Sequence, residues 1–204
     1  NATDGITVRK KQKQPLVSFC GMGDLPTVRS RLRYHIKNVY FEIRALFNKN
    51  WRARKLGIYW RQAAMRACSR SPLVGTHFIV RKAFSGSSKT IELDPAQARK
   101  EYLDSISNAD FVIAPKGDGN YSNRFFKTLC LGRIPVLTDT NVVLPLEDVI
   151  DYSLISVRVP MNRLRETPIY IRKFYDALTP EEWQQRQHLA RNIFEKYLRQ
   201  DSFL

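Results

Sequence analysis

Short apolar runs alternate with longer amphipathic stretches along this chain. The runs at residues 16–20, 77–80, 111–114, 134–137 and 153–159 have the length and composition of strands buried on both faces. Helix-start signals stand between them: Thr27, Asp94 followed by proline, and Thr179 with Glu182 in a capping box. This alternation predicts an α/β fold, a Rossmann-like parallel sheet with helices on both faces.

The pattern divides the chain into three parts. Residues 1–14 are polar and rich in lysine, which is typical of a flexible basic arm. Residues 15–160 hold all five predicted strands and form the Rossmann-like domain. Residues 161–204 hold amphipathic helices, which we expect to pack on that domain. With 204 residues the chain is long enough for one well-buried domain and short for two.

The stretch from residue 110 to 139 is the centre of the predicted fold. It reads as a buried strand, a polar turn with Gly117 and Gly119, a short helix with an apolar stripe, and another strand. Ser122 or Asn120 can cap the helix, and Gly132 stands where a glycine ends a helix.

A glycine-containing turn that opens onto a helix N-terminus can receive an anion. Free backbone N–H groups and the positive end of the helix dipole converge there, and Lys116 and Arg124 add positive charge. The alternative is an ordinary turn between strand and helix with solvated charges, and the spacing alone does not separate the two.

Other cations are predicted near the carboxyl ends of strands, where open α/β sheets bind ligands. Arg29 and Arg31 lie in the helix after the first strand, and Arg29 and Arg33 are one turn apart on the same side. Arg81 ends the second strand. The alternative for the helix is a basic face in solvent.

The charge of the chain is unevenly distributed. The net charge is +15, but residues 1–100 hold 21 Lys or Arg against 5 Asp or Glu, whereas residues 101–204 hold 13 against 14. The excess in the first half favours a polyanionic partner, either an acidic polysaccharide, a membrane surface or nucleic acid, although a solvated basic face is the alternative. The sequence carries no signature of a nucleic-acid-binding module.

The cysteines and histidines limit the kinds of disulfide and metal site that the chain can hold. Cys20, Cys68 and Cys130 are odd in number and widely spaced, so they indicate neither a disulfide framework nor a zinc site, and they favour a reducing compartment. No cluster of His, Asp and Glu has metal-ligand spacing. No apolar run is long enough to span a membrane, and the first residues lack the core of a signal peptide.

Several motifs together resemble the exostosin-like glycosyltransferases, glycosyltransferase family 47. The central one is APKGDGNYSNRFF at residues 114–126, followed by GRIPVL at 132–137 and VLPLEDVID at 143–151. FCG at 19–21, RSR at 29–31 and RKAFSG at 81–86 add to the likeness, which covers about residues 15–160.

The resemblance implies a transferase that moves a sugar from a nucleotide-sugar donor to a glycan acceptor. It implies the donor-binding, C-terminal half of a two-domain GT-B enzyme, with an N-terminal acceptor domain outside this chain. The reaction is expected to be inverting and metal-independent, without a cofactor, and the donor, expected to be UDP-linked, is a substrate. The expected catalytic carboxylate is Asp118, and the donor-binding residues are then Arg29, Arg31, Arg81, Lys116, Gly117, Gly119, Ser122, Arg124 and Lys127.

One position departs from the family pattern. The family has Arg-x-x-Glu where this chain has Arg124 and Lys127, so a donor-site carboxylate is replaced by a cation. Lys127 either contacts a phosphate or an acidic sugar, or it marks a donor site that has lost its activity. The alternative function is therefore a non-catalytic module that binds a polyanion or a glycan. The location is open: cytoplasmic or membrane-associated for a complete chain, and a Golgi-type lumen for a fragment of an anchored enzyme.

Overall fold

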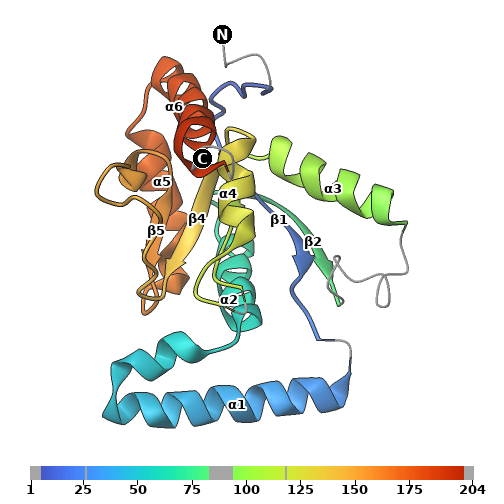
Figure 1. Ribbon diagram of the computed structural model, residues 1–204. Helices are drawn as coiled ribbons and strands as arrows, with labels where there is room; N and C mark the ends of the chain where they lie inside the picture. The colour runs from blue at the N-terminus through green and yellow to red at the C-terminus, as the bar shows by residue number, and fades with distance from the viewer. Residues whose placement is uncertain (1–5, 26, 83–93, 118, 200–204) are drawn as a thin grey trace.

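The computed structural model describes residues 6–25, 27–82, 94–117 and 119–199. In this part of the chain one parallel sheet has the strand order β2-β1-β3-β4-β5 (Figure 1). The predicted parallel α/β fold is confirmed, and each predicted strand is present with ends shifted by up to four residues. The strands are β1 (Leu16–Met22), β2 (Gly75–Arg81), β3 (Phe111–Ile113), β4 (Ile134–Asp139) and β5 (Val157–Pro160).

The helices begin where the sequence carries caps. The side chains of Thr27, Asp94 and Thr179 accept the predicted hydrogen bonds from the first turns of α1, α3 and α6. Gly132 follows α4 with a φ of +64°, as expected for a helix-ending glycine. The helices are α1 (Val28–Phe47), η1 (Lys49–Arg54), α2 (Gly57–Ser69), α3 (Pro95–Ser107), α4 (Asn123–Cys130), η2 (Tyr152–Leu154), η3 (Leu164–Glu166), α5 (Thr167–Asp176), α6 (Pro180–Ile193) and η4 (Phe194–Leu198).

The strand order places a switch point between β1 and β3. The chain passes from β1 to β2 in one direction and then crosses back over β1 to β3, β4 and β5. Right-handed crossovers therefore put α2 on one face of the sheet and α3 and α4 on the other. Contacts of α2 with α5 and of α4 with α6 complete the two layers. In sheets of this order, ligands bind at the carboxyl ends of the strands beside the switch point.

An aromatic cluster joins the C-terminal helices to the sheet. Phe111 of β3 contacts Tyr175 of α5 and Trp183 of α6, and the ring centroids of Tyr175 and Trp183 are 4.9 Å apart. All three side chains are buried. Residues 161–199 therefore share one apolar core with the sheet.

Residues 6–14 are tied to the domain, although the sequence predicted a flexible arm over residues 1–14. Arg9 forms an ion pair with the buried Asp110 at 2.8 Å, and its backbone exchanges hydrogen bonds with the Gln187 side chain. The Tyr175 hydroxyl accepts a hydrogen bond from the Gln12 backbone. The pattern of charges in this segment did not reveal these long-range partners.

Candidate functional site

The glycine-containing turn lies directly after the central strand β3. Within it, the Gly117 N–H donates to the Tyr121 carbonyl oxygen at 2.8 Å. Asn120 ties the turn to the loop after β4, because its amide accepts from the Thr140 hydroxyl and donates to the Thr140 carbonyl oxygen. Ser122 occupies the N-cap position of α4, but its side chain makes no capping hydrogen bond. The capping role predicted for Ser122 is therefore wrong in part: the position is right and the bond is absent.

The start of α2 presses against the same turn. A Cβ atom on Gly57 would lie 2.7 Å from the Lys116 carbonyl oxygen and 2.9 Å from that of Gly117, so only glycine fits there. The Lys116 ammonium reaches past α2 and donates to the Ala53 carbonyl oxygen at 3.0 Å. η1 and α2, which connect β1 to β2, thus pack against the turn on one side.

Arg124, in the first turn of α4, points inward at the switch point. Its Nη2 donates to the Cys20 carbonyl oxygen of β1 at 2.7 Å, and its Nη1 lies 3.5 Å from the Ile113 carbonyl oxygen of β3. The guanidinium also stacks on the Phe19 ring at 4.1 Å from the centroid. One side chain therefore joins α4 to the ends of both strands that flank the switch point.

Gly21 makes room for this arginine. Its φ is +140°, and a Cβ atom there would lie 2.8 Å from Nη2 of Arg124. Backbone of this kind favours glycine, and a side chain would displace the guanidinium. The FCG motif and Arg124, over 100 residues apart in sequence, thus form one structural unit.

Arg124 and Lys127 lie over the ring of Tyr102 of α3, and Arg81 is paired with the preceding residue, Glu101; these residues are called the Tyr102 cluster. Arg81 forms an ion pair with Glu101 at 2.7 Å. The Lys127 ammonium is 5.3 Å from the Tyr102 ring centroid, and the Arg124 guanidinium is 5.8 Å from it. The two cations of α4 avoid each other because Arg124 turns into the protein while Lys127 stays exposed.

Burial sets the electrostatics of this cluster. Desolvation lowers the pKa of Arg124, and the neighbouring Tyr102 partly offsets that effect. Burial likewise raises the pKa of the Cys20 thiol, against the opposing charges of Arg81 and Arg124. In the described part of the chain, Nε of Arg124 and Nη1 of Arg81 are buried without a hydrogen-bond partner. The oxygen of a water or a ligand can accept a hydrogen bond from such a buried N–H group.

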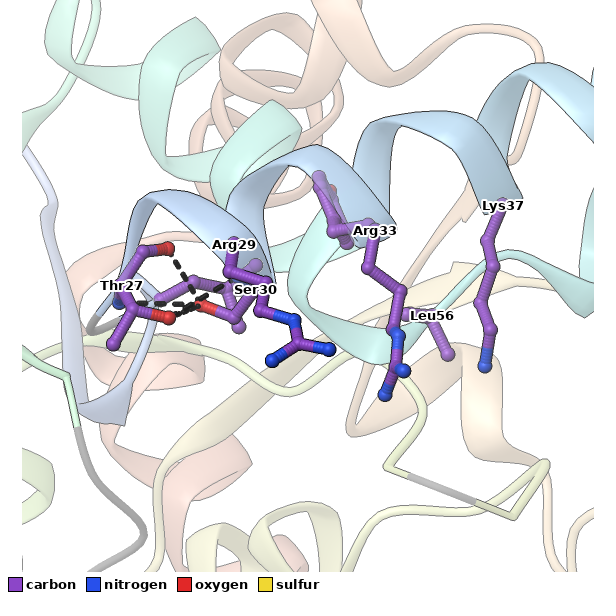
Figure 2. Close-up of a pocket in the computed structure, with 8 residues that line it drawn as sticks. Thr27, Arg29, Ser30, Arg33, Lys37 and Leu56 are labelled. Atoms are coloured by element: carbon purple, nitrogen blue, oxygen red, sulfur yellow. Dashed lines mark hydrogen bonds between the residues drawn. The ribbon is translucent and has the colours of Figure 1, made fainter.

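The two arginines predicted in α1 have different surroundings. Arg31 forms an ion pair with Asp24 at 2.8 Å and donates to the Leu25 carbonyl oxygen. Arg29 instead lines an open cavity of about 570 Å³ together with Arg33 and Lys37. Figure 2 shows these three side chains extending side by side from one face of the helix, as the sequence spacing predicted for Arg29 and Arg33.

The predicted site residues therefore fall into three groups. The first group is the turn and the start of α4, with Lys116, Gly117, Gly119 and Ser122. The second is the Tyr102 cluster, in which Arg124 and Lys127 lie over Tyr102 and Arg81 pairs with Glu101. The third is α1, where Arg29 lies in the cavity and Arg31 beside Asp24. Asp118, the predicted catalytic carboxylate, lies outside the described residues.

Glu101 and Tyr102 were not predicted from the sequence as neighbours of the site. Both come from α3, which crosses to the switch point only in the folded sheet. Ala98, Ser105 and Ile106 are buried at helical spacing around Tyr102, and this face could have placed Tyr102 against the sheet.

The described residues hold neither a metal-binding cluster nor a membrane-spanning helix. No three His, Cys, Asp or Glu side chains among them are placed to hold a metal ion. None of the helices described combines the length and the apolar character needed to cross a bilayer.

Comparison with known proteins supports the resemblance seen in the motifs. The family model of the Exostosin GT47 domain matches residues 45–174, well over half of the chain, and this range includes the turn, α4 and the Tyr102 cluster. The chain is similar to the Exostosin-1 homolog of Caenorhabditis elegans, with 27% identity over 101 residues. That alignment covers 50% of this chain and 25% of the relative, so the chain corresponds to a minor part of that protein.

Proposed function

Because this chain belongs to the exostosin GT47 glycosyltransferase family, we propose that it is the donor-binding half of an enzyme that transfers a sugar from a nucleotide sugar to a glycan. The observation that carries the proposal is the position of the glycine-containing turn. It follows the strand beside the switch point and opens onto α4, where nucleotide ligands bind in sheets of this kind.

The turn and the start of α4 are proposed to hold the donor diphosphate. Backbone N–H groups at residues 119–123 and the positive end of α4 suit an anion, whereas the Gly117 N–H is already bonded to the Tyr121 carbonyl oxygen. The Ser122 side chain makes no capping hydrogen bond to them. Lys116 and Lys127 flank this position, and Nε of Arg124 is an unused donor beneath it. The ring of Tyr121 lies 3.1 Å from where a Cβ atom on Gly119 would be, so a phosphate at Gly119 would displace this exposed side chain.

The proposed reaction is a single, inverting displacement. The acceptor hydroxyl attacks the anomeric carbon, the bond from that carbon to the diphosphate oxygen breaks, and a base takes the hydroxyl proton. The nucleoside diphosphate, which we propose to be UDP, leaves with its extra negative charge. Backbone amides and cationic side chains can stabilise that charge without a metal ion. Asp118 remains the proposed carboxylate of this chain, and the acceptor is proposed to bind to a part of the protein outside it.

A second function is favoured by one observation. Arg29, Arg33 and Lys37 stand side by side along one cavity, and α1 carries a single acid, Glu42, which is paired with Lys55. Such a row suits a polyanion and requires no nucleotide. The chain would then be a non-catalytic module that binds an acidic glycan.

Calorimetry with UDP, GDP and ADP at low and high salt tests the first function against the second. Selective binding of one nucleoside diphosphate that persists at high salt supports the donor site. A Lys127→Gln variant should weaken that binding, and Lys173→Gln on the exposed side of α5 serves as the matched control. Binding to any polyanion that disappears with salt, without nucleotide preference, would instead support the module.

A further inference from the structure

Helix α1 carries an exposed apolar face that the proposed function does not use. Residues Val28, Leu32, Ile36, Val39, Ile43 and Leu46 form this face. They recur at helical spacing and fall within an arc of about 80° around the axis. Each is at least half exposed, from 53% for Ile43 to 82% for Leu46, along the whole 20-residue helix.

The apolar face points away from the domain. The buried side of α1 consists of Tyr34, Asn38 and Ala45, which lie on the opposite side of the helix. Figure 1 shows α1 at one end of the molecule, apart from the sheet, and its main packing partner is η1. An exposed apolar patch of this length on a protein surface marks an interaction site.

Cations line the boundary of this face. Arg29, Arg33 and Lys37 follow one another at intervals of four residues, and Figure 2 shows them extending in one direction. The helix holds five Lys or Arg against one acid, Glu42, which is already paired with Lys55. An apolar face bordered by a row of unbalanced cations is the arrangement of helices that lie in the interface of an anionic bilayer.

A second copy of the chain fits this face less well. The spacing of Leu32, Ile36, Val39, Ile43 and Leu46 alternates between four and three residues, which is also the pattern of a coiled-coil seam. In a coiled coil the charges beside the seam must be complementary, and two copies of α1 would bring their cations together. The single acid of the helix cannot balance them.

We propose that α1 is an interfacial membrane helix that seats the domain on a bilayer surface rich in anionic phospholipid. The apolar face enters the boundary between headgroups and acyl chains, and Arg29, Arg33 and Lys37 contact lipid phosphates. Tyr40 and Phe47, both largely exposed, extend the apolar surface at its edge. The proposal does not depend on the glycosyltransferase reaction, since α1 lies almost wholly outside residues 45–174 that match the family.

Vesicle sedimentation tests the proposal directly. The chain is mixed with phosphatidylcholine vesicles, with and without phosphatidylserine, and the bound fraction is measured. We expect binding to the vesicles that contain phosphatidylserine, and a loss of about tenfold or more in the Ile36→Ser/Ile43→Ser variant. The matched control is Val143→Ser/Val149→Ser, which removes two exposed apolar side chains elsewhere and should bind like the wild type. Arg33→Gln/Lys37→Gln should weaken binding and reduce its salt dependence.

Tryptophan fluorescence adds a second readout. Trp60 and Trp183 are fully buried, whereas Trp51, in η1 beside α1, is partly exposed and stacks with Phe41. Because Phe41 lies on the side of α1 opposite the apolar face, Trp51 should report no insertion, and an Ile43→Trp variant serves as the probe. The emission of this added tryptophan should shift to the blue on vesicle addition and be quenched by brominated lipid.

Three results would overturn the proposal. One is the absence of binding to anionic vesicles. Another is binding that the Ile36→Ser/Ile43→Ser variant retains in full, because charge alone would then explain it. The last is a dimer, seen by light scattering, that this variant dissociates while vesicles bind neither form. Because the substituted side chains are exposed, circular dichroism should show an unchanged fold in every variant.

Discussion

Arg124 donates a hydrogen bond of 2.7 Å to the carbonyl oxygen of Cys20, and so connects the start of α4 to the end of β1. The bond crosses the switch point of the sheet, where β1 and β3 separate towards their carboxyl ends. Arg124, which the motif predicts as a donor-binding residue, thus also connects the two strands on either side of the proposed site.

Replacing Arg124 with alanine should therefore lower stability. The variant loses a charge-assisted bond to Cys20 and leaves its buried carbonyl oxygen unpaired, at a cost of about 1.5–3 kcal/mol. Urea denaturation measures this, and Arg165→Ala, which removes an exposed arginine, is the control. Nucleotide affinity is compared on the folded fraction, where an unchanged value would limit Arg124 to its structural role.

The Gly21→Ala variant tests the room left for that arginine. The positive φ of Gly21 and the 2.8 Å approach of Nη2 should together destabilise the variant by about 1–3 kcal/mol. Thermal or urea unfolding gives the difference. Gly75→Ala is the matched control, because its nearest contact is an ordinary 3.4 Å. Equal stability of the two variants would show that the loop after β1 adapts freely.

A Lys127→Glu variant tests the departure from the family pattern. The Lys127 ammonium is exposed above Tyr102, and the charge reversal should weaken nucleoside diphosphate binding about fivefold to tenfold if it contacts phosphate. Calorimetry and an assay of donor hydrolysis measure the effect. A gain in either assay would instead identify a degenerate donor site, and no change in both would place Lys127 outside it.

The chain should lose stability in alkali. Burial raises the pKa of Cys68 to about 12 from 9.0, and those of Tyr34 and Tyr152 to about 12 from 10.0. The unfolded chain releases these protons first, so their contribution is complete below pH 9 and is lost as the pH rises towards 12. Each group lowers the free energy of unfolding by up to about 1.4 kcal/mol per pH unit in that window.

Urea titrations between pH 8 and 11 check this expectation. The Cys68→Ala variant should show a shallower decline above pH 9 than the wild type, whatever its starting stability. A Val74→Ala variant, which removes buried apolar atoms but no ionisable group, should lose stability and keep the wild-type slope. Identical slopes for all three proteins would contradict the assignment to Cys68.

The sequence by itself determined the elements, their order and the turn. Apolar runs at residues 111–114 and 134–137, the caps at Thr27, Asp94 and Thr179, and the glycine after α4 are local signals, and each was found in place. Local signals suffice because strand burial, capping and turn geometry depend on neighbours within a few residues.

Only the tertiary structure decided which cations share a site. It turned Arg124 inward, paired Arg81 with Glu101 and Arg31 with Asp24, and left Arg29 beside Arg33 and Lys37. It also held Arg9 against Asp110, where the sequence predicted a flexible arm. The partners of long charged side chains lie on other elements, so they depend on how the backbone folds. A buried charge needs such a partner because burying it unpaired costs free energy.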